Sequence, residues 1–314
     1  MKLILRSLYN RVIRNKLLSQ LKNVRIDASS VCQLDCPLCP SKKEIKSGIV
    51  GWGYLKFSDF KQFIDINSQI SEIELSNWGE IFLNPELKEI IKYAYSRKIN
   101  LFADNGVNFN SVSEEVLECL VKYGFKRIII SLDGANNNSY IKYRKRGNFD
   151  KVIKNIEKIN FYKKKYKTEL PQLTWKMILF GHNEDEANIA EKMAHNLEMN
   201  FTTSPNWVPS WSPLKGEKIK TDEPFDCSPP CSQLWLSPQI NWDGKLLGCC
   251  ANYWGDFGNV FKEGFEKCLN NEKYIYAKRM VMGKEKTRSD IPCSNCHHYQ
   301  FQIIHSPIKI QDLL

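Results

Sequence analysis

The sequence predicts an α/β fold: a partial (β/α)6 barrel with a small C-terminal module made of a β-hairpin and a helix. Two observations predict it. β-branched segments alternate with helical segments of ten or more residues up to residue 206, and beyond that point prolines and cysteines become frequent. Such alternation indicates β–α units and a parallel sheet. About six units fit, too few for an eight-fold barrel, and an open doubly wound sheet is the alternative.

Local patterns place each element of the barrel. Short apolar or β-branched runs predict the strands, and Arg-Ile-Ile-Ile-Ser-Leu-Asp at 127–133 is the clearest of them. Pro85 and Ser113 are typical of helix starts. The predicted strands are 24–29, 72–77, 99–105, 127–133, 173–180 and 200–204, and the predicted helices are 57–66, 85–97, 113–123, 149–165 and 184–197.

The C-terminal third has a different composition. A proline-rich stretch at 206–231 predicts a linker or a wrapping segment. Segments 234–241 and 245–250 flank Trp242-Asp243-Gly244 and predict a hairpin. A helix at 265–282 and a cysteine-rich tail follow. We therefore expect a basic N-terminal helix at 1–23, a barrel at 24–206 and a smaller module at 207–314.

Composition excludes several classes of protein. The chain has 314 residues, a net charge of +10 and 42% hydrophobic residues, which is typical of a globular protein. No apolar run approaches the roughly 20 residues of a spanning helix, and no secretory signal is visible. We expect a cytoplasmic protein, in which eleven cysteines are more typical of metal or redox sites than of disulfides.

Most of the positive charge lies at the N-terminus. The first 25 residues contain seven basic residues and no acidic one, with leucines at helical spacing. This helix could contact anionic lipid at the inner membrane face, or it could pack against the body of the protein. No stripe of interleaved aromatic and basic residues indicates nucleic-acid binding, so none is expected.

Three cysteines form a compact group directly after the first predicted strand. Cys32, Cys36 and Cys39 have the spacing C-x3-C-x2-C. Three thiolates can bind three irons of a [4Fe–4S] cluster and leave the fourth iron open to a substrate. The alternative is a zinc site completed by a distant cysteine or histidine.

This motif and its position resemble the radical S-adenosylmethionine (SAM) superfamily. Later segments resemble that family in the same order. Asn77-Trp78-Gly79-Glu80 is similar to the Gly-Gly-Glu segment that binds the SAM amino group, although tryptophan replaces the first glycine. The resemblance implies that SAM is also held by Asn105, Ser131 and Arg144, the last at the SAM carboxylate.

The resemblance also implies the chemistry. An electron donor of the flavodoxin or ferredoxin type would reduce the cluster, and reductive cleavage of SAM would give a 5′-deoxyadenosyl radical. That radical can take a hydrogen atom from an unactivated carbon, so the protein must position the cofactor and exclude water.

A second group comprises Cys231, Cys249, Cys293 and Cys296. Four thiolates suit structural zinc or an iron–sulfur cluster, and spacing alone leaves both open. The pattern C-x(9–15)-G-x4-C followed by C-x2-C resembles the SPASM extension in its shortened, twitch form. This implies one auxiliary [4Fe–4S] cluster. Cys227 could replace Cys231 as a ligand.

The resemblance implies oxidation or epimerisation of a sugar or aminocyclitol. Cys250, which adjoins a predicted ligand, could return a hydrogen atom to a substrate radical, or it could be a buried neighbour of the cluster. Radical modification of a ribosomally made peptide is the alternative reaction. A non-catalytic, metal-stabilised binding module is the alternative of another class.

Overall fold

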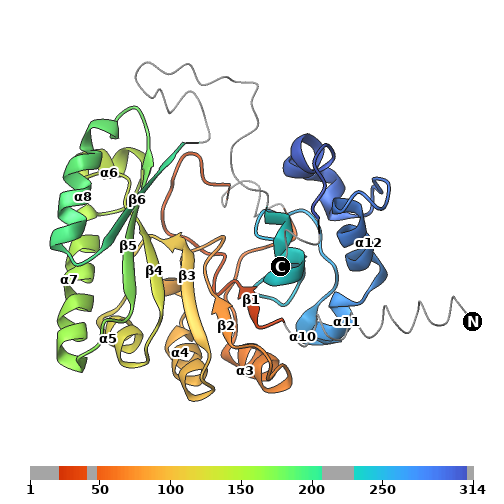
Figure 1. Ribbon diagram of the computed structural model, residues 1–314. Helices are drawn as coiled ribbons and strands as arrows, with labels where there is room; N and C mark the ends of the chain where they lie inside the picture. Colours follow the sequence, from red (N-terminus) through yellow and green to blue (C-terminus); the bar gives the residue numbers. More distant parts are fainter. Residues whose placement is uncertain (1–20, 41–47, 207–229, 310–314) are drawn as a thin grey trace, which may run out of the picture.

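The computed structural model describes residues 21–40, 48–206 and 230–309 as one twisted, curved sheet with helices along its outer face (Figure 1). The strands are β1 (Asn23–Ile26), β2 (Glu72–Glu74), β3 (Asn100–Val107), β4 (Arg127–Ser131), β5 (Gln172–Leu179), β6 (Asn200–Pro205), β7 (Gln239–Ile240) and β8 (Leu246–Gly248). The helices are α3 (Phe57–Ile66), α4 (Leu87–Ser96), α5 (Glu114–Lys122), α6 (Asn137–Tyr143), α7 (Phe149–Tyr166), α8 (Ala187–Asn196), α9 (Gln233–Leu236), α10 (Val260–Glu263), α11 (Phe265–Leu269) and α12 (Glu272–Val281).

The strand order is β6-β5-β4-β3-β2-β1-β7-β8. Strands β1 to β6 are parallel, and a helix follows each of the first five along the chain, as a partial barrel requires. The predicted fold class is therefore confirmed. The N-terminal helix predicted at 1–23 and the linker predicted at 206–231 lie almost wholly outside the described residues.

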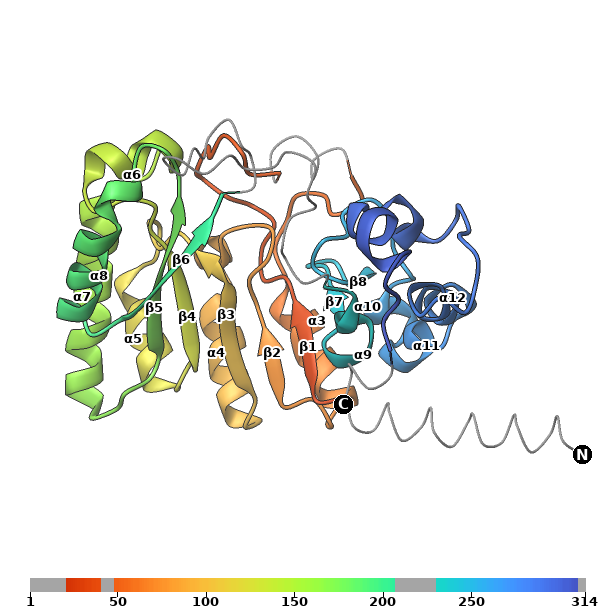
Figure 2. The same cartoon turned by 45° about the horizontal axis from the view of Figure 1, so that its top comes forward.

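The hairpin of the C-terminal module extends the barrel sheet. Strand β7 pairs in parallel with β1, with Arg25 opposite Gln239 and Ile26 opposite Ile240, and β8 runs antiparallel to β7. The Asp27 amide donates to the Ile240 carbonyl at 3.0 Å. Because an unpaired strand edge leaves backbone groups unsatisfied, the hairpin completes the edge that β1 would otherwise expose. Figure 2 shows the hairpin beside β1.

Two local predictions were wrong, and one helix was missed. Residues 233–236 form the short helix α9, so the strand predicted to begin at residue 234 is limited to β7. The helix predicted at 265–282 is two helices, because Asn271 accepts a hydrogen bond from the Tyr274 amide and starts α12 afresh. Helix α6, which begins at an Asn136 cap, was not predicted.

The sheet has an apolar outer face and a polar inner face. Ile26, Ile73, Ile128 and Trp175 are buried beneath the helices. The alternate positions, which face inward because side chains alternate along a strand, are largely polar. They include Arg25, Glu74, Asp104, Arg127, Ser131, Lys176 and Thr202. None of the helices in the described part of the chain is both long and apolar enough to cross a bilayer.

Candidate active site

The first cysteine group follows β1 at the carboxyl edge of the parallel sheet, where active sites of such folds lie. Cys32, Cys36 and Cys39 share a small apolar cluster with Tyr143 and Phe180, separate from the main core. The Cys39 amide donates to the Cys36 carbonyl at 3.2 Å. Burial raises the pKa of Cys32 to about 12, and Glu80 and the two other thiols add to the rise. A bound cation would favour the thiolates instead.

Gly79 sits against the backbone that leads into this group. A Cβ at Gly79 would lie 2.5 Å from the Ser29 carbonyl oxygen and 2.5 Å from the Ser30 carbonyl carbon. The next residue, Glu80, donates its backbone amide to the Val31 carbonyl at 2.8 Å. The absence of a side chain at Gly79 therefore lets the loop after β2 hold the start of the cysteine loop.

Glu80 is a buried carboxylate beside the first cysteine group. It is 1% exposed and accepts the amides of Asn108 at 2.6 Å and Phe82 at 3.3 Å. Burial raises its pKa to about 7, against the opposing effect of these hydrogen bonds. Asn108, which the sequence analysis missed, also directs its side-chain amide at the Cys32 sulfur, 3.6 Å away.

Arg144 reaches the same group from the end of α6. Its Nε lies 2.5 Å from Oδ2 of Asp133, which is fully buried, and its Nη1 lies 3.9 Å from the Cys36 sulfur. Asp133 also accepts the Ile178 amide at 2.7 Å, so the acid is fixed by the neighbouring strand. Glu80 and Arg144 thus both adjoin the cysteine loop, as the predicted SAM contacts would require.

The other two predicted SAM contacts lie along the same edge of the sheet. Asn105 donates its side-chain amide to Asn77 at 2.6 Å. Ser131 packs against Gly106, where a Cβ would lie 2.7 Å from the serine hydroxyl and where φ is +105°. Asn105 leads through Asn77 toward the C-terminal module, because Asn77 Nδ2 donates to the Cys250 carbonyl.

The second cysteine group surrounds one cavity. Cys231, Cys249, Cys293 and Cys296 line it, and its other walls are largely apolar: Leu234, Leu247, Asn252, Trp254, Pro292 and Tyr299. Burial and the neighbouring thiols raise the pKa of Cys231 and of Cys293 to about 12. Cys227, the alternative ligand, lies outside the described residues.

This donor set fits a cluster better than a single ion. Across the described residues, no three His, Cys, Asp or Glu side chains converge closely enough to hold one metal ion. The ligands of zinc surround one atom at about 2.3 Å, whereas each thiolate of a [4Fe–4S] cluster binds a different iron. Four cysteines spread around one apolar cavity therefore match the wider cluster.

Cys250 lies outside that cavity lining. Its amide donates to Gln233 Oε1 at 2.7 Å, its sulfur accepts Gln233 Nε2 at 3.5 Å, and its carbonyl accepts Asn77 Nδ2 at 3.1 Å. Burial raises its pKa, while Arg25 on the inner face of β1 opposes the rise. The thiol therefore lies next to the barrel. The sequence analysis missed Gln233 and the contact of Asn77 with Cys250, since only the fold brings these residues together.

Two family models match the chain: the Radical SAM superfamily over residues 26–194, and SPASM, an iron–sulfur cluster-binding domain, over residues 231–297. An AdoMet-dependent heme synthase of Methanosarcina barkeri is 29% identical over 129 residues, which cover 40% of this chain and 35% of the relative. A GTP 3′,8-cyclase of Clostridium botulinum is 28% identical over 141 residues, or 43% of this chain and 42% of the relative. The chain thus spans about two fifths of these curated relatives.

Solved structures share the fold. SuiB of Streptococcus suis superposes with a TM-score of 0.63 and 11% identity, covering 90% of this chain and 72% of SuiB. BtrN, in complex with AdoMet and 2-DOIA, superposes with a TM-score of 0.52 and 13% identity, covering 88% of this chain and 93% of BtrN. The cofactors that follow are a SAM-binding [4Fe–4S] cluster, SAM and an auxiliary [4Fe–4S] cluster. The chain belongs to the radical SAM superfamily and carries a C-terminal SPASM-type iron–sulfur cluster-binding domain.

Proposed function

We propose that the protein is a radical SAM oxidoreductase or epimerase that acts on a sugar or aminocyclitol. The observation that carries the proposal is the separation of its thiols into two groups. Three cysteines stand at the carboxyl edge of the barrel, and four others line a cavity in the C-terminal module. A set of three leaves one iron free for SAM, and a set of four closes a cluster.

Cys32, Cys36 and Cys39 hold the SAM-binding cluster in this proposal, and Cys231, Cys249, Cys293 and Cys296 hold the auxiliary one. When bound, the first cluster and SAM supply a 5′-deoxyadenosyl radical that removes a hydrogen atom from the substrate. A reduced flavodoxin or ferredoxin is the proposed electron donor.

The protein's own groups bind and orient SAM. The buried Glu80 carboxylate lies beside Cys32 and accepts the amino group of the methionine moiety. Arg144, held by Asp133, presents its guanidinium to the carboxylate. Gly79 lets the loop after β2 contact the start of the cysteine loop. Tyr143 and Phe180, whose rings lie 4.3 Å apart, form an apolar wall that keeps water from the reacting atoms.

The inner face of the sheet supports a hydroxylated substrate. Lys176 and Thr202 lie side by side across β5 and β6, and Ser131 on β4, a predicted SAM contact, completes the row. Ser131 and Lys176 are partly buried, and Thr202 is exposed. Hydroxyl and ammonium groups in a row can hydrogen-bond the hydroxyls of a sugar ring. Radical modification of a peptide is the competing proposal, in which the same polar side chains would hydrogen-bond backbone amides of the peptide.

Two outcomes follow hydrogen removal. If the substrate radical loses an electron and a proton, an alcohol becomes a ketone, and the auxiliary cluster is the proposed electron acceptor. If the radical instead receives a hydrogen atom from a thiol, its carbon can be inverted, and the thiyl radical left behind would take up a proton and an electron from the proposed flavodoxin or ferredoxin. The position of Cys250 outside the auxiliary cavity and beside the barrel favours it as the donor in the second case.

The test uses anaerobically purified, reduced protein with SAM and separate panels of sugars, aminocyclitols and peptides. We expect 5′-deoxyadenosine to form faster with a sugar or an aminocyclitol from the first two panels. Mass spectrometry of the product of that sugar or aminocyclitol then distinguishes the two reactions, because oxidation lowers its mass by two units and epimerisation leaves it unchanged. Stimulation by a peptide alone would overturn the carbohydrate proposal. A content of about eight irons per chain would exclude the non-catalytic binding module.

A further inference from the structure

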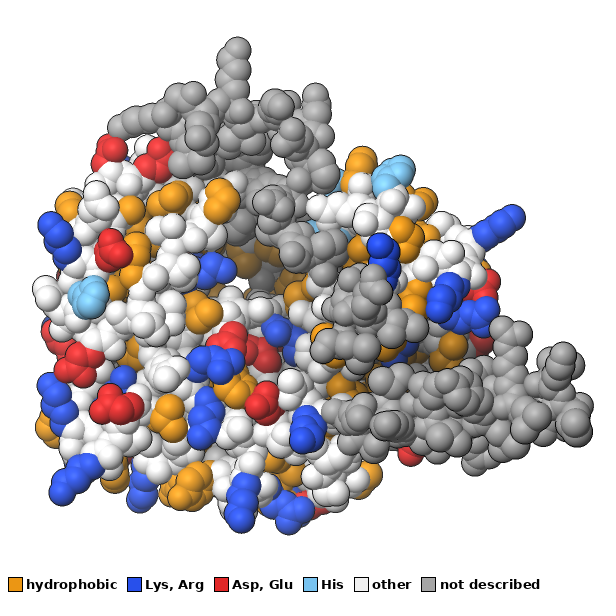
Figure 3. All heavy atoms as spheres, in the orientation of Figure 1, with side chains coloured by type: hydrophobic (Ala, Val, Ile, Leu, Met, Phe, Trp, Pro, Cys, Tyr) orange, Lys and Arg blue, Asp and Glu red, His pale blue; other side chains and the backbone are white. Residues whose placement is uncertain are grey.

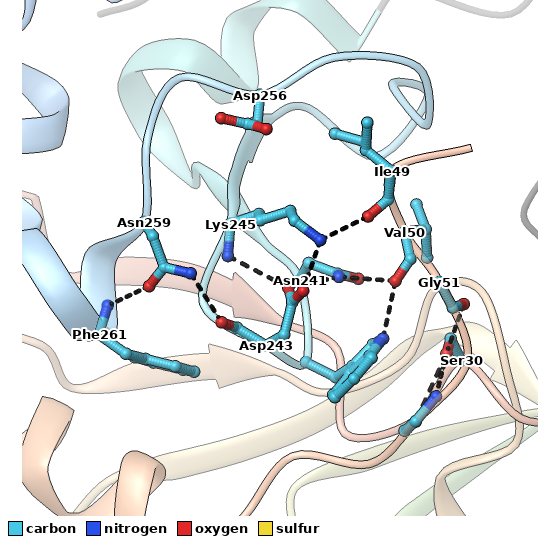
Figure 4. A network of polar contacts seen from close by, with 12 residues as sticks. Ser30, Ile49, Val50, Gly51, Asn241, Asp243, Lys245, Asp256, Asn259 and Phe261 are labelled. Carbon is cyan, nitrogen blue, oxygen red and sulfur yellow. Dashed lines mark hydrogen bonds and ion pairs between the residues drawn. The ribbon is translucent and has the colours of Figure 1, made fainter.

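The turn of the β7–β8 hairpin, residues 241–245, holds the chain that leaves the first cysteine loop (Figure 4). Lys245 Nζ donates to the Ile49 carbonyl at 2.8 Å. Asn241 Nδ2 and Trp242 Nε1 both donate to the Val50 carbonyl, at 2.9 Å and 2.8 Å. Three donors of the C-terminal module thus converge on two consecutive carbonyls of the barrel.

The turn is itself rigidly built. Asp243 accepts Asn241 Nδ2 at 2.7 Å through one oxygen and pairs with Lys245 Nζ at 2.6 Å through the other. Asn259 fixes the Asp243 carbonyl at 2.9 Å. The turn therefore holds the donors in the direction of the Ile49 and Val50 carbonyls. Less conformational entropy is lost when these hydrogen bonds form.

The contacted segment is joined in turn to the start of the cysteine loop. Ser30 Oγ donates to the Gly51 carbonyl at 3.1 Å and accepts the Gly53 amide at 2.9 Å. Ser30 lies two residues before Cys32. A Cβ at Gly53 would lie 2.5 Å from the Trp242 ring, so the indole packs directly on this segment. Hydrogen bonds therefore join the start of the cysteine loop, the segment at 49–53 that follows it and the hairpin turn. We call these three parts the base of the loop.

We propose that the hairpin turn of the SPASM-type domain positions the SAM-binding cluster. Asn241, Trp242 and Lys245 are positioning residues: they fix the base of the loop that carries Cys32, Cys36 and Cys39. Misplacement of reacting groups by about 1 Å can cost a hundredfold in rate. The proposal rests on the assignment of these three cysteines under the proposed function.

The experiment uses the full-length protein with its clusters. Lys245→Met removes the ammonium and keeps the stem, and Lys245→Arg keeps a donor. Trp242→Phe removes the Nε1 donor together with part of the indole that packs on Gly53. Lys267→Met is the matched control, because Lys267 lies in the same domain and has an exposed ion pair with Glu263. The measurements are iron content, thermal stability, the change in the electron paramagnetic resonance (EPR) signal of the reduced cluster on adding SAM, and 5′-deoxyadenosine formation without substrate.

We expect Lys245→Met and Trp242→Phe to keep about eight irons, to lose most of the SAM-induced EPR change and to form 5′-deoxyadenosine about tenfold more slowly. Lys245→Arg should recover most of the rate, and Lys267→Met should match the unmodified protein. Wild-type SAM cleavage in both donor-deleted variants would overturn the proposal. If Lys245→Met fails to fold, Trp242→Phe decides alone.

A further variant separates this proposal from the one on which it rests. Replacing Cys32, Cys36 and Cys39 together by alanine should abolish SAM cleavage. If cleavage persists, the assignment of the SAM-binding cluster is wrong. If cleavage is abolished there but is normal in the hairpin variants, only the positioning role is wrong.

Discussion

The side chain of Gln233 binds Cys250 at two points. Its oxygen accepts the Cys250 amide at 2.7 Å, and its nitrogen donates to the Cys250 sulfur at 3.5 Å. A side chain that holds both the backbone and the thiol of one residue fixes the direction of that thiol. Because Cys250 is the proposed hydrogen-atom donor, this contact makes its role open to direct test.

We predict that Cys250→Ala keeps SAM cleavage and loses hydrogen return. A thiol proton exchanges with solvent, so a hydrogen atom delivered by Cys250 in D2O would be deuterium. Mass spectrometry of the product should show one deuterium with the unmodified protein and none with the variant. Cys268→Ala, a buried cysteine in α11, is the control. Deuterium in the product of Cys250→Ala would show that another group returns hydrogen.

The auxiliary assignment predicts how iron divides between the two sites. Cys249→Ala, which removes one wall of the cavity, should lower the iron content from about eight to about four per chain. The SAM-induced EPR change should persist, because the first cluster has its own ligands. Cys227→Ala should keep all the iron, as should the control Cys119→Ala in the core.

Loss of iron in Cys227→Ala together with full iron in Cys231→Ala would contradict the assignment. It would show that Cys227, and not Cys231, is the fourth ligand. The thiol of Cys231 interacts electrostatically with Cys293 and Cys296. That proximity is the reason to favour Cys231 as the ligand.

Patterns along the chain predicted the elements of the barrel well. They did not predict contacts between residues that lie far apart in the sequence. Helix α3 lies at its predicted residues, and the six parallel strands begin and end within a few residues of expectation, because periodicity is a local signal. The bond between Asn77 and Cys250 joins residues 173 positions apart. No local pattern reports such a contact.

The same distinction applies to the cysteines. The spacing of Cys32, Cys36 and Cys39 is compact enough to be recognised in the sequence. The roles of Asn108 and Gln233 depend on which strand ends become neighbours. The extension of the sheet by β7 likewise depends on the open edge of β1, a property of the folded barrel.

Gly79→Ala should disturb the first cluster more than the second. A methyl group there would lie 2.5 Å from the backbone at Ser29 and Ser30, which cannot move aside as a flexible side chain would. Overpacking of this kind typically costs about 1–3 kcal/mol. We expect a lower melting temperature and loss of the SAM-induced EPR change.

The control for that substitution is Gly124→Ala. Gly124 has a φ of +62°, but its nearest neighbour is 4.0 Å away. Gly124→Ala should lower the free energy of unfolding by about 1 kcal/mol through backbone strain alone, and the EPR change should persist. Equal effects of the two substitutions on the EPR change would show that general destabilisation, and not the contact with the cysteine loop, is responsible.

Glu80 should make the stability of the protein without its clusters and without SAM fall as pH rises. Burial raises its pKa from 4.5 to about 7. Between these values the folded protein keeps a proton that the unfolded chain has released, so stability is fully present below pH 4.5 and declines through pH 7. The decline has an upper bound of about 3 kcal/mol. Urea unfolding across this range should show it, and Glu80→Gln should flatten it, whereas Glu191→Gln on the surface of α8 should not.

SAM binding should show the opposite trend with pH. The ionised carboxylate is the form that attracts the SAM ammonium group, so a group with a pKa of about 7 must release its proton when SAM binds. Affinity measured by equilibrium dialysis should therefore rise about tenfold for each pH unit below 7 and level off above it. Glu80→Gln should bind SAM weakly and lose this dependence. A pH-dependent affinity that survives in Glu80→Gln would assign the proton to another group and would leave Glu80 with a structural role, as the acceptor of the Phe82 and Asn108 amides.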